Sequence, residues 1–196
     1  MKTANYPLQS EDWKISEPRT VFSNPVMQMV ASRVRCGRTG KDQDFYRFEF
    51  PSWVNIVATT NAGDLVLVRQ YRFGTNRVEL EIPGGAVNID EDPLAAGLRE
   101  LLEETGYAGK NGRIIGKVCP NPAIQSNTCY TILVENAQQV AAPDQDDMED
   151  IKVLTLPREK VDALVISGAI DHGLVLNGLM FFAMEMQRIA GKVQGM

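Results

Sequence analysis

Residues 85–107 combine glutamates and glycines at a spacing that could hold divalent cations. The glutamates of this stretch are Glu91, Glu100, Glu103 and Glu104. Glu103 and Glu104 lie three and four positions after Glu100, so on a helix these three side chains share one face. Like charges on one face repel each other, and a hard cation such as Mg²⁺, which prefers oxygen ligands, removes that repulsion. Because Mn²⁺ suits the same ligands, the pattern predicts a site for Mg²⁺ or Mn²⁺.

The segment that carries Glu100, Glu103 and Glu104 has the signals of a helix. Asp92 is a good N-cap residue, Pro93 suits the first helical position, and Gly106 can end the helix in a left-handed conformation. The apolar residues between them recur at helical spacing, at Leu94, Leu98 and Leu101. This stripe lies on a different arc from the glutamates and is expected to face the core. The preceding Gly84-Gly85 turn lets the backbone approach the glutamates, so a main-chain carbonyl could add a ligand.

The same residues fill every position of the motif G-x5-E-x7-R-E-U-x-E-E-x-G-U, in which U is a bulky apolar residue. The filled positions are Gly85, Glu91, Arg99, Glu100, Leu101, Glu103, Glu104, Gly106 and Tyr107. With each fixed residue type at roughly 7% usage, seven fixed positions coincide by chance on the order of once in 10^8 windows. The chain therefore resembles the Nudix hydrolases, whose members hydrolyse a nucleoside diphosphate linked to another group.

The resemblance implies roles for the motif residues. Glu100 and Glu104 correspond to the principal metal ligands, and Glu103 joins them when more than one ion is bound. The carbonyl of Gly84 corresponds to a family metal contact just before the motif. The residues with implied structural roles are Gly85, Glu91, Arg99 and Gly106. In this interpretation the ion pair within that set ties the loop to the helix; the alternative is a surface pair of little energetic worth.

Segments outside the motif resemble the branch of the family that hydrolyses ADP-ribose and other nucleoside diphosphate sugars. They are residues 51–58, 68–73, 79–85 and the region beginning at Trp13. In this branch Arg72, nine residues before Glu81, corresponds to an arginine that touches the substrate diphosphate, and arginine donates bidentately to phosphate. Glu81 corresponds to a substrate or metal-site carboxylate. Trp13 could stack a nucleobase in dimeric members, or could simply pack against its neighbours.

An acidic loop precedes the strand expected from residue 151. Its carboxylates are Asp146, Asp147, Glu149 and Asp150. In the ADP-ribose branch one loop carboxylate binds metal or accepts a proton from the attacking water. Glu149 aligns best with that residue, and Asp147 lies where a base stands two residues earlier; the alternative is a solvated loop. His172, the only histidine, and Trp53 are interpreted as structural.

The functional hypothesis is metal-dependent hydrolysis of the pyrophosphate bond of a nucleoside diphosphate sugar, giving a nucleoside monophosphate and a sugar phosphate. The catalytic candidates are Glu103, Glu149 and Asp147. Residues 119–127 depart from the Ser-Pro-Gly type of segment that many ADP-ribose hydrolases carry, which favours a broader enzyme that also accepts substrates such as GDP-mannose. Three alternatives stay open: a nucleotide-sugar sensor without hydrolysis, an isomerase, and an enzyme acting on nucleoside triphosphates or dinucleotides.

The order of the expected elements predicts an α/β fold of the α+β type, with a mixed sheet between helices. The Nudix fold is an α/β/α sandwich of that kind. Residues 1–50 are expected to form a small antiparallel β subdomain of two or three strands for dimerisation and substrate cover, and residues 51–196 the Nudix domain. The remaining expectations are a hairpin at residues 54–71, a polar loop at 137–150, and helices at 157–167 and 173–191. A homodimer is implied by the resemblance alone.

Composition and charge argue against several other classes. The chain has 196 residues, of which 44% are hydrophobic and 23% charged, as in ordinary soluble proteins. Its net charge of −5 argues against a nucleic-acid surface. The three cysteines, Cys36, Cys119 and Cys129, lack the spacing of a zinc site or disulfide framework. Because no apolar stretch is long enough for a membrane span and residues 1–14 lack a signal-peptide core, a cytoplasmic location is expected.

Overall fold

The computed structural model describes residues 13–145 and 148–194. The chain divides into two compact units: residues 1–50 with 121–126, and residues 51–120 with 127–196. Sequence analysis placed residues 121–126 in the second part, whereas they pack with the first. The roles that it gave to the two parts stay predictions.

The first unit is a four-stranded antiparallel sheet. Its strands are β1 (Trp13–Ile15), β2 (Arg19–Ser23), β3 (Gln28–Cys36) and β4 (Asp42–Glu49). β3 is central, because β4 pairs along its length while β1 and β2 pair with its two ends. Residues 121–126 join this unit through the N–H of Phe48, which donates to the carbonyl of Ile124 (2.8 Å). The described part of the unit thus has four strands, where two or three were expected.

The second unit is built on an eight-stranded mixed sheet with the order β10-β11-β5-β6-β12. Three short strands extend it, since β7 pairs with β6, β8 with β5 and β9 with β11. The strands are β5 (Trp53–Thr60), β6 (Leu65–Arg72), β7 (Arg77–Glu81), β8 (Gly84–Ala86), β9 (Tyr107–Ala108), β10 (Arg113–Val118), β11 (Cys129–Gln139) and β12 (Lys152–Leu156). β5 and β11 run parallel and the other pairs antiparallel, so the predicted mixed sheet is confirmed.

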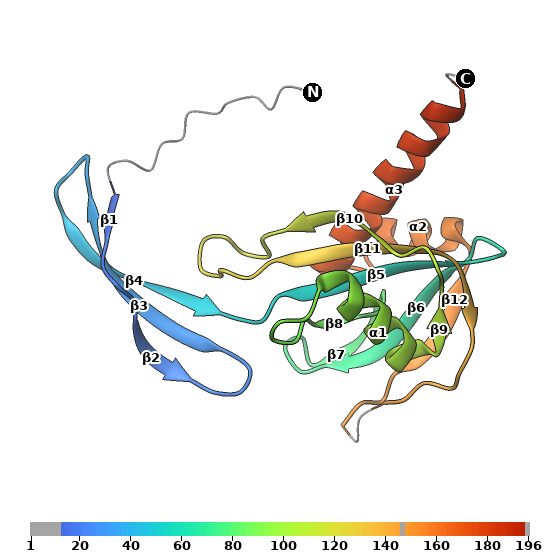
Figure 1. Cartoon of the computed structure of the whole chain (residues 1–196), viewed down its shortest axis with the longest axis horizontal. Helices are drawn as coiled ribbons and strands as arrows, with labels where there is room; N and C mark the ends of the chain where they lie inside the picture. The colour runs from blue at the N-terminus through green and yellow to red at the C-terminus, as the bar shows by residue number, and fades with distance from the viewer. Residues whose placement is uncertain (1–12, 146–147, 195–196) are drawn as a thin grey trace. The chain divides into compact units, whose positions relative to one another are not determined.

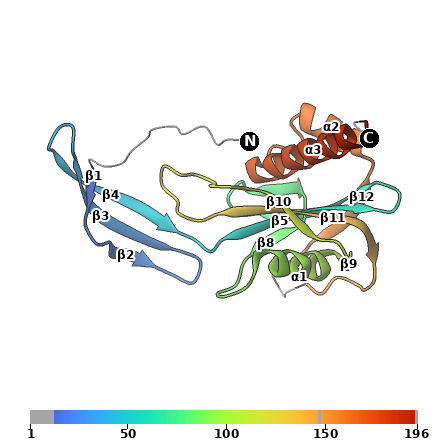
Figure 2. The ribbon, with the colours of Figure 1, turned by 45° about the horizontal axis from the view of Figure 1, so that its top comes forward.

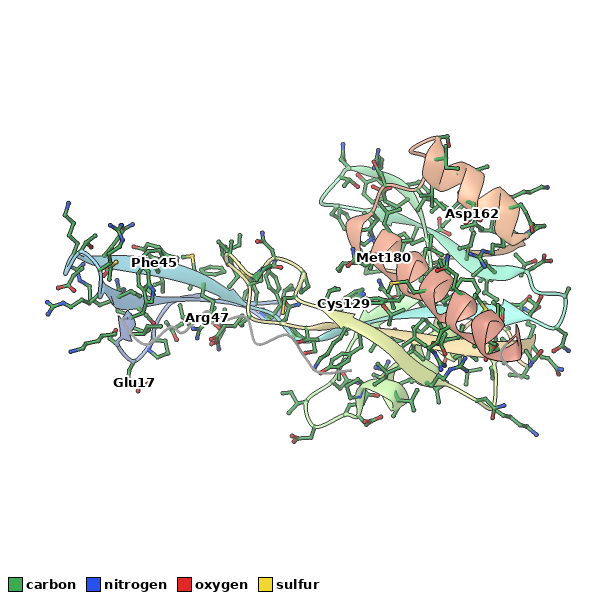
Figure 3. The ribbon with its side chains drawn as sticks, turned by 90° about the horizontal axis from the view of Figure 1, so that it is seen from above. Glu17, Phe45, Arg47, Cys129, Asp162 and Met180 are labelled. Carbon is green, nitrogen blue, oxygen red and sulfur yellow. The ribbon has the colours of Figure 1, made fainter. Side chains whose placement is uncertain are left out.

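Helices cover both faces of this sheet. Those described are α1 (Pro93–Thr105), α2 (Arg158–Ile166) and α3 (Gly173–Gln194). In Figures 1 and 2, α1 lies on one face and α2 with α3 on the other; Figure 3 looks onto the second face, where Met180 is labelled on α3. Because side chains alternate along a strand, β5 sends Val54 and Ile56 into the core under α1 but Val57 into the core under α2 and α3. The predicted α/β/α sandwich is confirmed.

The boundaries of α1 are those expected from its capping residues. The Oδ1 atom of Asp92 accepts hydrogen bonds from the N–H groups of Leu94 (3.0 Å) and Ala95 (3.1 Å). Pro93 is the first helical residue, and Gly106 ends the helix with φ of 72°. These local interactions place Glu100, Glu103 and Glu104 on a helix, as predicted.

Two strand expectations need correction. β11 continues to Gln139 through residues that were expected to be loop, because Gln138 and Gln139 pair with β9. The hairpin expected at residues 54–71 is confined to one backbone pair, Thr59 with Leu65. Beyond that pair the strands separate, since β5 pairs with β8 and β11 while β6 pairs with β7 and β12.

The last helix, α3, ends at Gln194, beyond the expected residue 191. In the described part of the chain, no helix is both long and apolar enough to cross a membrane.

Replacing Gly106 by alanine should destabilise the protein more than the same change at Gly63. Both glycines have positive φ, 72° and 86°, so each substitution costs about 1–2 kcal/mol of backbone strain. A Cβ at Gly63 meets nothing within 4 Å, whereas one at Gly106 would overlap the carbonyl oxygen of Ala141. Urea unfolding should therefore show a total loss of about 3 kcal/mol for Gly106→Ala. Equal losses for the two variants would contradict the packing described for the end of α1.

Candidate active site

Two consecutive glycines bring the backbone of β8 against carboxylates of α1. The N–H of Gly84 donates to the carboxylate of Glu104, with an N···Oε2 distance of 3.0 Å. A Cβ on Gly85 would overlap the carboxylate of Glu100, and a Cβ on Gly84 would lie 2.5 Å from a carbonyl oxygen of β5. Only glycine allows this approach, which places two carboxylates of the helix beside the same stretch of backbone.

Burial makes these carboxylates hard to ionise. It raises the pKa of Glu104 to about 8; the bond from Gly84 lowers that pKa, and the charge of Glu100 raises it. Burial also raises the pKa of Glu100, against hydrogen bonds from Arg99. The charge of Glu149 adds to both upward shifts, so this side chain lies close enough to act on the other two. Buried negative charges that repel one another are stabilised by a nearby cation.

Arg99 joins the loop before α1 to the helix. Its Nε and Nη2 donate to the two carboxylate oxygens of Glu91 (2.9 and 3.0 Å), and Nη2 also donates to the carbonyl of Ala86 (3.2 Å). Its Nη1 donates to Glu100 (2.9 Å) and Glu103 (2.8 Å). Because only 31% of the arginine side chain is exposed, these bonds are better protected from solvent than an ordinary surface pair.

The carboxylates lie near one another but are not gathered around one point. Among the residues that the structure describes, no three His, Cys, Asp or Glu side chains have the arrangement of a metal site. Arg99 and a backbone amide hold the motif carboxylates instead. The donor set still fits Mg²⁺ or Mn²⁺, because it consists of oxygen atoms packed against glycine backbone. Of the predicted ligands, the structure brings together Gly84, Glu100 and Glu104. Glu149 lies nearby, and Glu103 has 44% of its side chain exposed.

A cavity of about 890 Å³ shares Glu149 with this acidic cluster. Its wall includes Trp53, Arg72, Arg77, Glu79, Glu81 and His172. The volume lies within the range of about 300–1,000 Å³ that is usual for small-molecule sites. The cavity therefore offers room for a substrate next to the carboxylates.

Arg72 and Glu81, both predicted to contact substrate, contact each other. Nε and Nη2 of Arg72 donate to the two carboxylate oxygens of Glu81, at 2.9 and 2.7 Å. Burial works to raise the pKa of Glu81, but the hydrogen bonds from Arg72 and the proximity of His172 lower the value to about 2. Glu81 is only 2% exposed, so its direct role is to hold the guanidinium in the cavity wall.

Sequence analysis missed several cavity residues. His172, interpreted as structural, has its Nδ1 3.4 Å from a carboxylate oxygen of Glu81. Trp53 also lines the cavity. Arg77 and Glu79 alternate with Glu81 along β7 and form an ion pair with each other (2.7 Å). The period of two could have revealed these β7 residues, but no local signal links His172 to a strand so distant in sequence.

One further predicted residue lies elsewhere, and another is not described by the structure. Trp13 belongs to the first unit, where it lines a separate cavity of about 330 Å³ with Tyr46 and Ile124. Asp147, the second candidate for the base, lies outside the described residues, as does Asp146.

The pair of Arg72 and Glu81 should give a measurable pH dependence of stability. Because the pKa of Glu81 is depressed to about 2 in the folded protein, its stabilisation is fully present above an unfolded pKa near 4.5 and is lost as pH falls toward 2. Glu81→Gln removes this contribution, so the difference in unfolding free energy from wild type should shrink, by up to about 3 kcal/mol, over that interval. Glu17→Gln, an exposed change, is the control. A difference independent of pH would contradict the ionised pair.

Comparisons with known proteins agree with the geometry of the site. The model of the NUDIX domain matches residues 50–171. The chain is 27% identical over 152 residues to an ADP-ribose pyrophosphatase of Bacillus subtilis (strain 168), covering 76% of this chain and 82% of that protein. It is 35% identical over 117 residues to an ADP-sugar pyrophosphatase of Mus musculus, covering 55% and 52%. A crystal structure of an ADP compounds hydrolase shares the fold, with a TM-score of 0.79 at 19% identity over 90% of this chain and 95% of the other. The chain belongs to the Nudix family of hydrolases.

Proposed function

We propose that this Nudix hydrolase cleaves the pyrophosphate bond of nucleoside diphosphate sugars of the ADP-ribose or GDP-mannose type, releasing a nucleoside monophosphate and a sugar phosphate. One observation carries the proposal: the buried carboxylates of Glu100 and Glu104 lie against the Gly84-Gly85 backbone, and Glu149 connects them to a cavity of about 890 Å³. The names of the relatives, ADP-ribose pyrophosphatase and ADP-sugar pyrophosphatase, support the choice of substrate class.

Nudix hydrolases generally use divalent metal ions. In this chain the carbonyl of Gly84 and the carboxylates of Glu100 and Glu104 would hold Mg²⁺, or Mn²⁺ in its place, with Glu103 and Glu149 as additional ligands. When bound, such an ion supplies positive charge to the phosphate oxygens and makes water more acidic.

Arg72 positions the diphosphate in this mechanism. Its bonds to Glu81 use two of the five N–H groups of the guanidinium, so the others can donate to phosphate oxygens. Because buried Glu81 holds the group from inside the protein, the arginine is oriented before substrate arrives. Its charge then stabilises the negative charge that develops on the leaving phosphate.

Glu149 receives the proton of the attacking water in this scheme. It lines the cavity, and its charge acts on both Glu100 and Glu104, so it is near both the substrate space and the ligand carboxylates. Proton transfer to a positioned carboxylate is ordinary general base catalysis. Asp147 is the second candidate for this role.

The proposed enzyme is a homodimer in which the first unit of one chain covers the site of the other. Support comes from large apolar side chains that are exposed on the four-stranded sheet: Trp13, Ile15, Phe22, Phe45 and Tyr46. Large apolar side chains exposed on a sheet favour a protein partner. Light scattering on the full chain should give the mass of two copies; a monomer would remove this part of the proposal.

The test of the function is product analysis across a substrate panel. ADP-ribose, GDP-mannose, UDP-glucose, dinucleotides and nucleoside triphosphates are each incubated with Mg²⁺ and, separately, with EDTA. The proposal expects metal-dependent release of nucleoside monophosphate and sugar phosphate from the sugars. Binding without hydrolysis would instead identify a sensor, and preferred cleavage of triphosphates or dinucleotides would identify another branch. Rearrangement without release of phosphate esters would identify an isomerase.

Glu104→Gln should reduce kcat by at least about 100-fold, the size expected when charge stabilisation at a reacting group is lost. The glutamine oxygen can still accept the hydrogen bond from Gly84, so circular dichroism and thermal unfolding should resemble wild type. Glu159→Gln, an exposed change on α2, is the matched control and should keep full activity. An active, metal-responsive Glu104→Gln variant would contradict the assignment.

A further inference from the structure

Trp53 stands at the start of β5, between the motif backbone and the cavity. Its backbone N–H donates to the carbonyl of Thr128 (2.9 Å), and it pairs with Ala86 of β8. Alternation along β5 puts its side chain on the same face of the sheet as Asn55 and Val57, the face that α3 covers. The tryptophan also lines the 890 Å³ cavity.

The indole is held in one orientation. Its Nε1–H donates to Oδ1 of Asn55 (3.0 Å), and Nδ2 of the same amide donates to the carbonyl of Leu174 at the start of α3 (2.9 Å). Asn55 is only 3% exposed, so turning its amide over would break both bonds in a buried place. A Cβ on Gly84 would lie 3.3 Å from the indole nitrogen, so backbone closes over this edge of the ring. Since its one polar group is bonded inside the protein, Trp53 can offer a ligand only its apolar ring surface.

The cavity has polar groups at its other end. Arg77, Glu79 and Glu81 alternate along β7, which leads to Gly84 and hence to Trp53. Arg77 forms an ion pair with Asp171, and the hydroxyl of Thr75 donates to Glu79 (2.6 Å). At about 3.3 Å per residue, Arg77 and Glu81 lie about 13 Å apart along the strand.

Each part of the cavity suits a different part of the substrate. The polar groups around Arg77 suit the hydroxyls of a sugar, and Arg72, held at Glu81, suits the diphosphate between the two ends. We propose that Trp53 is the surface on which the nucleobase stacks, with the sugar toward Arg77 and Thr75. The inference rests on the proposed function and adds a specificity rule. Stacking without a hydrogen bond from the indole tolerates different bases. Because purines have a larger ring area than pyrimidines, we expect purine nucleotides to bind more tightly.

The test uses the two tryptophans of the chain one at a time. The variant Trp13→Phe retains only Trp53, and Trp53→Phe retains only Trp13. Each full-length variant is titrated with AMP, GMP and CMP, and with ribose 5-phosphate and mannose 1-phosphate, while tryptophan emission is recorded. We expect the nucleotides to quench Trp53, with AMP and GMP binding more tightly than CMP, and the sugar phosphates to leave its emission unchanged.

Three results would overturn the inference. They are quenching of Trp53 by the sugar phosphates, a response confined to Trp13, and unchanged Trp53 emission up to about 10 mM AMP, above the usual range of KM. The failures are distinguishable. Wild-type hydrolysis of nucleotide sugars without quenching of Trp53 removes only this inference, whereas absence of hydrolysis removes the proposed function whatever Trp53 does.

Kinetics separates stacking from a merely structural role. Trp53→Leu should raise KM for ADP-ribose about tenfold with kcat within about twofold of wild type, because base stacking acts in the bound ground state as well as the transition state. Trp53→Phe, which keeps an aromatic ring, should recover most of the affinity, and the rise in KM should be smaller for UDP-glucose. Equal losses for all substrates, or a loss confined to kcat, would contradict stacking.

Discussion

The hydrogen bond from the Gly84 amide to the Glu104 carboxylate is the interaction on which the site depends. It joins β8, which belongs to the central sheet, to α1, which covers one face of that sheet. The adjacent Gly85 lets Glu100 lie against the same backbone. Because both carboxyl groups are buried there, their ionised, negatively charged forms are costly in free energy. The sandwich core supplies the packing that maintains this arrangement.

The remaining groups of the site can be understood as responses to that charge. Arg99 partly neutralises Glu100 and Glu103 while tying them to the loop before the helix. Arg72 is held by Glu81 in the cavity wall, where its charge also lowers the pKa of Glu104. A divalent cation and a diphosphate would complete the charge balance of the site, since the cation neutralises the carboxylates and Arg72 neutralises the phosphates. The Nudix family to which the chain belongs suits this distribution of charge.

Features governed by local interactions could be predicted from the sequence. Asp92 and Gly106 cap α1 where their types indicate, and the spacing of Glu100 and Glu104 places both beside the glycine turn. Features that depend on contacts between distant parts of the sequence could not be predicted. Residues 121–126 pack with the first unit, β11 is extended by pairing with β9, and His172 reaches Glu81 from the start of α3. Trp53 offered no signal either, because its orientation depends on Asn55 and on a carbonyl of α3.

The most direct test of the central claim is calorimetric titration of Mn²⁺ into the full-length wild type and the Gly85→Ala variant. The added methyl group meets the end of a flexible glutamate side chain, so the fold should survive while the Glu100 carboxylate is displaced. We predict saturable binding to wild type and an affinity lower by about tenfold or more in the variant, the size of effect expected from disturbing a metal site without removing a ligand. Equal affinity in the two proteins, or no saturable binding to wild type, would contradict the account.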